Sequence, residues 1–267
     1  MTIKSQFRGS FSSCMLFFNC PRQFYYKKVL KLPDDGDKKY GQAGSVVHDM
    51  LDEYYRSKFH SIKLNNIFDN KWYKKYSLPE VIDKKRNINT YKSMFLKALK
   101  LKLRITMTEL VIDFNDFKYI IDGVTLSPIS HNDTGDNINP NVSKNIISRN
   151  NKFITIIDWK TSWEKSSFNV NDYTMQLRCY AWGYYRKYGI IVDKCIVYYL
   201  NTGETIKIKP NIDTITKTEK FFNSVINRIN NANGLGIKHY PCKKCDDFCP
   251  YVKRCMEDNN IICQMPT

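Results

Sequence analysis

The segment 154–162, with the sequence ITIIDWKTS, decides how the fold of this chain is interpreted. Its first four residues are Ile, Thr, Ile and Ile, which favour a buried β-strand. The strand then ends on Asp158, Trp159 and Lys160. Because side chains at positions i and i+2 of a strand lie on one face, roughly 6.5–7 Å apart, Asp158 and Lys160 should point to one side and Trp159 to the other.

This pair of charges has the chemistry that metal-dependent hydrolysis of a phosphodiester needs. A hard divalent cation such as Mg²⁺ prefers carboxylate oxygens as ligands. An ammonium group beside the attacking water stabilises the negative charge that develops during the reaction. An Asp-x-Lys triplet also occurs as a simple surface ion pair, so its interpretation depends on which other polar residues adjoin apolar segments.

Three such residues are present. Asp122 follows the apolar run of YIIDGV and offers a second carboxylate, and Glu109 in MTELVIDF is an earlier acidic candidate. His48 offers an imidazole from a segment with helical spacing. The alternatives are that Asp122 accepts hydrogen bonds in a turn and that His48 is an ordinary half-buried helix residue.

The hydrophobic periodicity predicts alternating helices and strands. We expect helices at 11–30 (interrupted at Pro21), 44–59, 91–105, 171–189 and 213–232. We expect strands at 107–114, 117–126, 153–160, 193–201 and 204–210, the first two forming a hairpin. Helices followed by strands interleaved with helices indicate an α/β or α+β domain.

The composition describes a folded and strongly basic protein. The chain has 267 residues, of which 42% are hydrophobic and 14% aromatic, and this excludes an intrinsically disordered chain. Its 42 Lys and Arg against 26 Asp and Glu give a net charge of +16. This excess favours a polyanionic partner, most simply nucleic acid, although a generally Lys-rich proteome would produce it too.

The chain shows no apolar signal segment at its start and no run of about 18 apolar residues that would cross a membrane. We therefore expect an intracellular, reducing location, either the cytoplasm or a host cell in which a phage or virus protein acts. In such a compartment the nine cysteines indicate metal binding rather than disulfides.

Five segments together resemble the RecB-like branch of the PD-(D/E)XK nuclease superfamily, over residues 9–255. The segments are SFSSCMLFFNCPRQFYY, GSVVHDML, YIIDGV, IIDWKTS and QLRCYAW. The resemblance implies a restriction-endonuclease-like α/β core, in which helices flank a mixed central sheet. We expect one nuclease domain over 1–267, with an insertion at 130–152 and a Cys-rich tail at 234–267.

The resemblance also implies roles for the polar residues. His48, Asp122 and Asp158 would bind Mg²⁺ or Mn²⁺, and the main-chain carbonyl of Trp159 would join them. Lys160 would position or activate the attacking water and neutralise the transition state. These five residues would form the centre of the site.

A helix pair would support this centre. Gln176 and Tyr180 lie one helical turn apart and therefore share a face. By resemblance Gln176 orients the lysine or the DNA, whereas Tyr180 could equally be a packing residue. Asp122 and Asp158 are 36 positions apart (158 minus 122), a wider spacing than we expect for the family, with the polar insertion between them.

The tail concentrates cysteines. Cys242, Cys245, Cys249 and Cys255 lie in YPCKKCDDFCPYVKRC. Four thiolates so close together fit a zinc site or an iron–sulfur cluster.

The resemblance favours the iron–sulfur cluster, of the 4Fe-4S type, as in the branch that includes AddB and the exonuclease of CRISPR adaptation. One ligand would be Cys20, near the N-terminus, and the others Cys245, Cys249 and Cys255, with Cys242 as the alternative to Cys245. The cluster would join the N- and C-terminal segments. The remaining cysteines have the context of ordinary thiols: Cys14, Cys179, Cys195 and Cys263.

Two segments mix aromatic and basic residues, 21–31 and 71–76. Aromatic rings stack on unpaired bases while cations contact phosphates. The other interpretation is that the rings belong to the core and only the lysines face solvent.

Taken together, these features favour a metal-dependent DNA nuclease, an exonuclease acting on DNA ends or single strands in recombination, repair or phage DNA processing. The alternatives are a non-catalytic nucleic-acid-binding module with a zinc-stapled tail, and a structure-specific endonuclease. Cleavage polarity and any helicase or recombination partner stay open.

Overall fold

The structure is a computed structural model of the whole chain, and it describes seven segments: 7–33, 38–57, 64–114, 117–128, 152–162, 167–232 and 249–258. Most of the expected insertion at 130–152 lies outside these residues. So do Cys242, Cys245 and Cys263. Within the described segments, no helix combines the length and apolar character that crossing a membrane requires.

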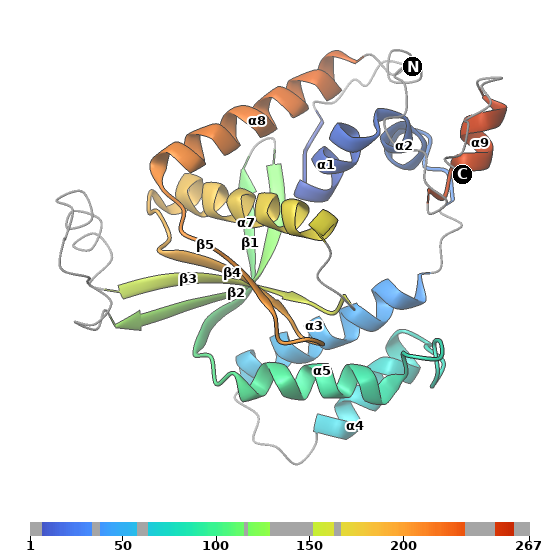
Figure 1. Ribbon diagram of the computed structural model, residues 1–267, viewed down its shortest axis with the longest axis vertical. Coiled ribbons are helices and arrows are strands. Elements are labelled where there is room, and N and C mark those ends of the chain that lie inside the picture. Colours follow the sequence, from blue (N-terminus) through green and yellow to red (C-terminus); the bar gives the residue numbers. More distant parts are fainter. Residues whose placement is uncertain are drawn as a thin grey trace. The chain divides into compact units, whose positions relative to one another are not determined.

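The chain alternates helices and strands as the sequence predicts (Figure 1). The helices are α1 (Phe11–Asn19), α2 (Pro21–Phe24), α3 (Lys39–Ser57), α4 (Leu64–Asp69), α5 (Ile88–Lys100), α7 (Ser167–Tyr188), α8 (Ile212–Asn231) and α9 (Val252–Glu257), with π-helical turns η1 (Tyr25–Val29) and η2 (Asn70–Lys75). The strands are β1 (Ile105–Phe114), β2 (Phe117–Pro128), β3 (Lys152–Lys160), β4 (Lys194–Tyr199) and β5 (Thr205–Ile208).

The five strands form one mixed sheet in the order β1-β2-β3-β4-β5. Strand β3 pairs antiparallel with β2 and parallel with β4, and β4 pairs antiparallel with β5. The parallel β3–β4 pair needs a crossover, which α7 provides. Residues 154–159 of the central strand β3 are all buried, as expected for a strand covered on both faces.

The chain divides into two compact units, and the larger one, Lys38–Ile112 with Ile120–Thr218, contains most of the sheet. Helix α7 packs against β3, β4 and β5 (Figure 1). Helices α3, α4 and α5 form a separate apolar cluster that includes the fully buried Trp72 and extends to Ile157 and Trp159 of β3. Trp159 therefore faces the α3–α5 cluster, away from the side on which Asp158 lies, as the strand alternation predicts.

The smaller unit combines residues Met1–Asp37, Asp113–Tyr119 and Glu219–Thr267. Its core is aromatic: Phe117 contacts Phe222 edge to face at 5.3 Å, and Phe17 contacts Phe24 at 5.4 Å. Segments from both ends of the chain thus contribute to one core. Whether the two units act as the single expected domain stays a prediction.

Several element boundaries differ from those the sequence predicts. Helix α3 begins at Lys39 and not at Gly44, because its apolar stripe starts at the buried Ala43 and the two glycines before His48 do not interrupt it. Helix α5 begins three residues early because the Asn87 side chain accepts a hydrogen bond from the Thr90 amide.

Polar side chains also begin two other helices. Ser10 caps α1 through a capping box. The side chain of Asn211 accepts a hydrogen bond from the Thr214 amide at the start of α8.

The base-stacking interpretation of the two aromatic, basic segments is wrong for their main rings. Phe24 and Tyr26 are each 1% exposed, and Trp72 is fully buried, so these rings belong to the apolar core. In the second segment, Lys71 and Lys75 form ion pairs with Glu53 and Asp49. The alternation of rings and cations there reflects a helix with one buried and one solvated face.

Candidate active site

The register of the sheet brings together two carboxylates that are far apart in sequence. Gly123 of β2 lies opposite Ile157 of β3, so the next residues along these antiparallel strands are Asp122 and Asp158. The main-chain N–H of Trp159 donates a hydrogen bond to Asp122 Oδ2 at 2.8 Å. Asp122 and Asp158 are therefore close in space although they are 36 positions apart in sequence.

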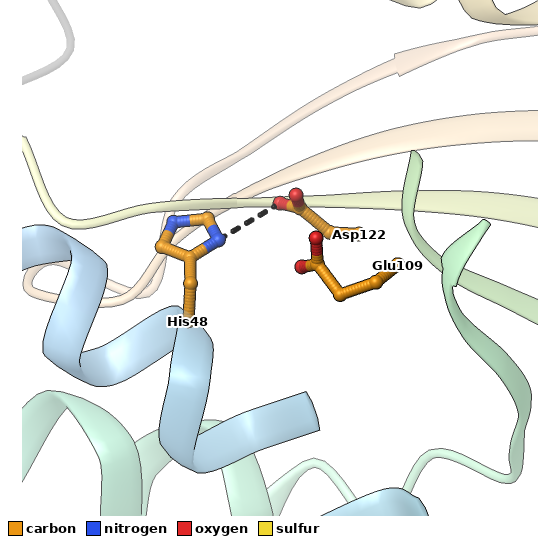
Figure 2. Close-up of side chains that lie close together, drawn as sticks. All are labelled: His48, Glu109 and Asp122. Carbon is orange, nitrogen blue, oxygen red and sulfur yellow. Dashed lines mark ion pairs between the residues drawn. The ribbon is translucent and has the colours of Figure 1, made fainter. Parts of the chain in front are cut away.

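Helix α3 supplies the imidazole. His48 Nδ1 lies 3.4 Å from Asp122 Oδ2 (Figure 2). One turn earlier on the same helix, Gly44 approaches the end of β3 so closely that a Cβ atom there would lie 2.6 Å from Thr161 Oγ1. Steric contact thus explains why a glycine precedes His48 by four positions: Gly44 lets α3 pack against the end of β3.

This close approach makes a testable prediction. Gly44→Leu should lower the free energy of unfolding by about 1–3 kcal/mol, because the side chain has no room beside Thr161, and it should displace His48. Gly41→Ala in the same helix is the control: its methyl group meets nothing within 4 Å, and it should stabilise the protein by up to about 1 kcal/mol. Urea unfolding of both variants measures this, and equal stabilities would contradict it.

Strand β1 contributes Glu109, an acidic candidate of the sequence to which the family resemblance assigns no role. Glu109, His48 and Asp122 each offer a ligand atom within 4.8 Å of those of the other two (Figure 2). Glu109 has a φ of 47°, a left-handed conformation that costs a non-glycine residue about 1–3 kcal/mol. Such outliers concentrate at functional sites, and nothing in the local sequence announces this one.

Lysine and aspartate of the Asp-x-Lys triplet contact each other directly. Lys160 Nζ lies 2.8 Å from Asp158 Oδ2, and the Asp158 side chain is 1% exposed. On its other side, Lys160 Nζ lies 4.7 Å from the centre of the Tyr173 ring. The lysine is therefore held between a buried carboxylate and an aromatic face.

Helix α7 connects to the same carboxylate. Gln176 Nε2 donates a hydrogen bond to the Tyr180 hydroxyl at 2.6 Å, and this hydroxyl donates a longer one to Asp158 Oδ1 at 3.4 Å. Gln176 thus reaches Asp158 through Tyr180. Among the hydrogen bonds of the described segments, none joins Gln176 directly to Lys160.

Burial and neighbouring charges shift the pKa values of the three acids in different directions. Burial raises the pKa of Asp158, and the neighbouring Asp122 raises it further. Burial and Asp122 likewise raise the pKa of Glu109. Burial alone would also raise the pKa of Asp122, but His48 and Lys160 outweigh it and the pKa falls below its ordinary value.

The neighbouring carboxylates raise the pKa of both basic groups of the site. Burial opposes the charge on Lys160, yet Asp158 and Asp122 raise its pKa above the ordinary value. Asp122 does the same for His48. Three carboxylates against these two bases form a donor set that suits a hard divalent cation, because a cation would relieve the repulsion that resists ionisation of Asp158 and Glu109.

Comparison with known families agrees with this arrangement. The family profile of the PD-(D/E)XK nuclease superfamily matches residues 8–256. The chain belongs to the PD-(D/E)XK nuclease superfamily. Its mixed sheet flanked by helices is the restriction-endonuclease-like fold expected from the sequence.

A solved structure shows the same fold for this PD-(D/E)XK chain. It is of a candidate exonuclease from Eubacterium rectale, which has 13% sequence identity and a TM-score of 0.50 over 98% of this chain and 91% of that one. At 13% sequence identity, this structural similarity supports the fold and nothing more. A search of curated proteins found no match.

Three of the expected cluster ligands of this PD-(D/E)XK chain, Cys20, Cys249 and Cys255, belong to the smaller unit. Cys20 and Cys255 are 8% and 9% exposed, and Cys249 packs against the cluster of Tyr26, Tyr251 and Cys255. Arg22 Nη1 donates a hydrogen bond to Cys255 Sγ at 3.1 Å. The fourth expected ligand, Cys245, and its alternative lie outside the described residues.

The buried guanidinium is suited to anionic sulfur. Burial alone would lower the pKa of Arg22, but Cys255 and Cys20 raise it. A thiolate or a negatively charged cluster would therefore be stabilised at this place. The other cysteines expected to be ordinary thiols, Cys14, Cys179 and Cys195, are fully buried.

Proposed function

We propose that this protein is a divalent-metal-dependent deoxyribonuclease that degrades DNA from free ends or as single strands. The observation that carries the proposal is the meeting of His48, Glu109 and Asp122 beside the buried ion pair of Asp158 and Lys160. Membership of a nuclease superfamily supports the reaction class. The net charge of +16 supports a polyanionic substrate.

In this proposal the acids and the imidazole hold Mg²⁺ or Mn²⁺. The ligands are drawn from His48, Asp122 and Asp158 with the Trp159 carbonyl, and the geometry adds Glu109. A cation bound there supplies Lewis acidity toward the phosphate and lowers the pKa of coordinated water.

The remaining residues act around the scissile phosphate. Lys160 offers an ammonium group to the attacking water and to the charge that develops in the transition state. Tyr180 holds Asp158 in place, and Gln176 holds Tyr180. Gln176 is thus a positioning residue in this proposal.

We further propose that Cys20, Cys249 and Cys255, with Cys245 as the fourth ligand, bind a 4Fe-4S cluster that fastens the two chain ends to each other. The hydrogen bond from Arg22 to Cys255 supports an anionic sulfur site. Zinc is the alternative metal. The reduced cysteines of such a site fit an intracellular protein, encoded by a cell or by a phage or virus.

The test of the proposed function uses anaerobically purified protein with end-labelled linear DNA, single-stranded and duplex, and with closed circular DNA. Linear DNA should be degraded with Mg²⁺ or Mn²⁺ and stay intact with chelator. Cleavage of circular duplex would favour a structure-specific endonuclease. Tight binding without any cleavage would favour the non-catalytic binding module.

A further inference from the structure

A cavity adjoins the candidate active site on the side of Lys160. It has a volume of about 440 Å³ and is lined by Tyr40, Gly41, His48, Arg86, Tyr91, Trp159, Lys160, Thr161, Ser162 and Tyr173, all from the larger unit. Its lining residues include two cations, an imidazole and four aromatic residues. No carboxylate is among the described residues that line it.

The cations of this cavity are paired with its aromatic rings. The Arg86 guanidinium carbon lies 4.6 Å from the centre of the Tyr40 ring, just as Lys160 Nζ lies over Tyr173. Tyr40 is 38% exposed, whereas Tyr91 and Trp159 are nearly buried. Tyr40 is therefore the accessible aromatic residue of this cavity, whereas Tyr91 and Trp159 also belong to the apolar core.

Arg86 sits on an ordered loop. Its guanidinium lies 3.0 Å from Asp83 Oδ2, and its backbone carbonyl accepts a hydrogen bond from the Ile82 amide. The capping box of Asn87 and Thr90 begins α5 directly after it. A cation held in this way loses little freedom on meeting an anion.

The size of the cavity selects among possible ligands. It falls in the range of about 300–1,000 Å³ that holds small molecules. A cavity of this volume that is equally wide in all directions is roughly 8 Å across. The major groove of B-DNA alone is ~12 Å wide, so a whole duplex is too wide to enter the cavity. An unpaired nucleotide does, with its base against rings and its phosphate against cations.

We propose that this cavity, which we call the Tyr40–Arg86 pocket, receives an unpaired nucleotide of DNA next to the bond that is cut. Arg86 contacts the phosphate of that nucleotide, and Tyr40 and Tyr173 flank its base. This proposal rests on the proposed nuclease function. It specifies the substrate class as a single strand of DNA or an unpaired DNA end.

The test measures binding in chelator, so that no cleavage is needed. Wild type, Arg86→Gln, Tyr40→Leu and Gly41→Trp are titrated into fluorescein-labelled oligothymidylate and into a blunt duplex containing the same strand. Gly41 lines the pocket, and a Cβ there meets nothing within 4 Å, so Gly41→Trp is designed to occupy the pocket with an indole. Each variant should raise the Kd for the single strand about tenfold and change the Kd for the duplex much less.

Two variants outside the pocket serve as controls. Lys217→Gln removes a cation that is also paired with an aspartate, Asp213, and Leu96→Trp adds an indole at a position that is 48% exposed. Both should keep the wild-type Kd. Circular dichroism confirms that each variant is folded.

Two outcomes would overturn the proposal that the Tyr40–Arg86 pocket binds an unpaired nucleotide. One is that Arg86→Gln and Tyr40→Leu bind the single strand as tightly as the controls do. The other is that Arg86→Gln and Gly41→Trp weaken duplex and single-strand binding equally. A wild type that binds single strands through these residues and cuts no DNA with metal would refute the proposed function and leave the pocket standing.

Discussion

Asp158→Asn should lower kcat for DNA cleavage by about 100- to 1,000-fold while the protein still folds. The side chain is 1% exposed, contacts Lys160, and accepts a hydrogen bond from Tyr180. The amide keeps the shape of the carboxylate but removes its charge, so both the proposed metal site and the partner of Lys160 are lost. Initial rates on end-labelled single-stranded DNA with Mn²⁺ measure the effect.

Lys160→Gln should cause a loss of similar size, mainly in kcat and less in KM, because the ammonium group acts on the charge that forms in the transition state. The matched control is Asp213→Asn, which removes the acid of an exposed ion pair in the same unit and should leave the rate unchanged. If Asp158→Asn and Lys160→Gln both cut at the wild-type rate, neither residue belongs to the active site.

Cys255→Ser should empty the proposed cluster and unfold much of the smaller unit. Structural metal sites contribute on the order of 10 kcal/mol to the folded state, and Cys255 is nearly buried beside Arg22. Anaerobically purified wild type should contain about four iron atoms per chain, and the variant close to none, with a clear fall in Tm. Iron, sulfide and zinc analysis together with thermal unfolding measure this.

The control for that experiment is Cys14→Ala, which removes a fully buried thiol of the same unit that the proposal does not use as a ligand. It should cost some stability through the lost packing and keep the iron. Zinc in place of iron in the wild type would replace the iron–sulfur cluster by the zinc alternative. Full iron content in Cys255→Ser would remove this cysteine from the ligand set.

The sequence predicts the centre of the site because simple periodicity controls it. Alternation along one strand is enough to place Asp158 and Lys160 together and to send Trp159 into the opposite core. The resemblance adds Asp122, and the register of β2 and β3 shows why a separation of 36 positions does not matter: the antiparallel pairing brings the two acids to neighbouring positions.

Other parts of the site depend on features that no local pattern encodes. Glu109 is an acidic candidate in the sequence, but it reaches His48 and Asp122 through a left-handed backbone that glutamate rarely adopts, so no strand pattern predicts that the three residues meet. Arg86 lies in a polar region that periodicity does not resolve, and its place in the Tyr40–Arg86 pocket follows from tertiary contacts.

For some aromatic residues, the sequence suggests a functional surface that the structure does not have. Tyr26 and Trp72 stand among lysines in the sequence, which suggests a surface for bases, yet both are buried. Composition cannot tell a stacking surface from an amphipathic helix whose rings face inward. Two aromatic residues that line a cavity beside the site, Tyr40 and Tyr173, stand apart from other aromatic residues in the sequence.

The central claim is that a divalent cation binds among acids from β1, β2 and β3. Anomalous scattering from crystals of the active protein soaked in Mn²⁺ tests this most directly. The account predicts a manganese peak within coordinating distance of Asp122 and of Glu109 or Asp158, and its loss in Asp122→Asn. Crystals of active protein with no peak there, or with manganese bound only elsewhere, would contradict it.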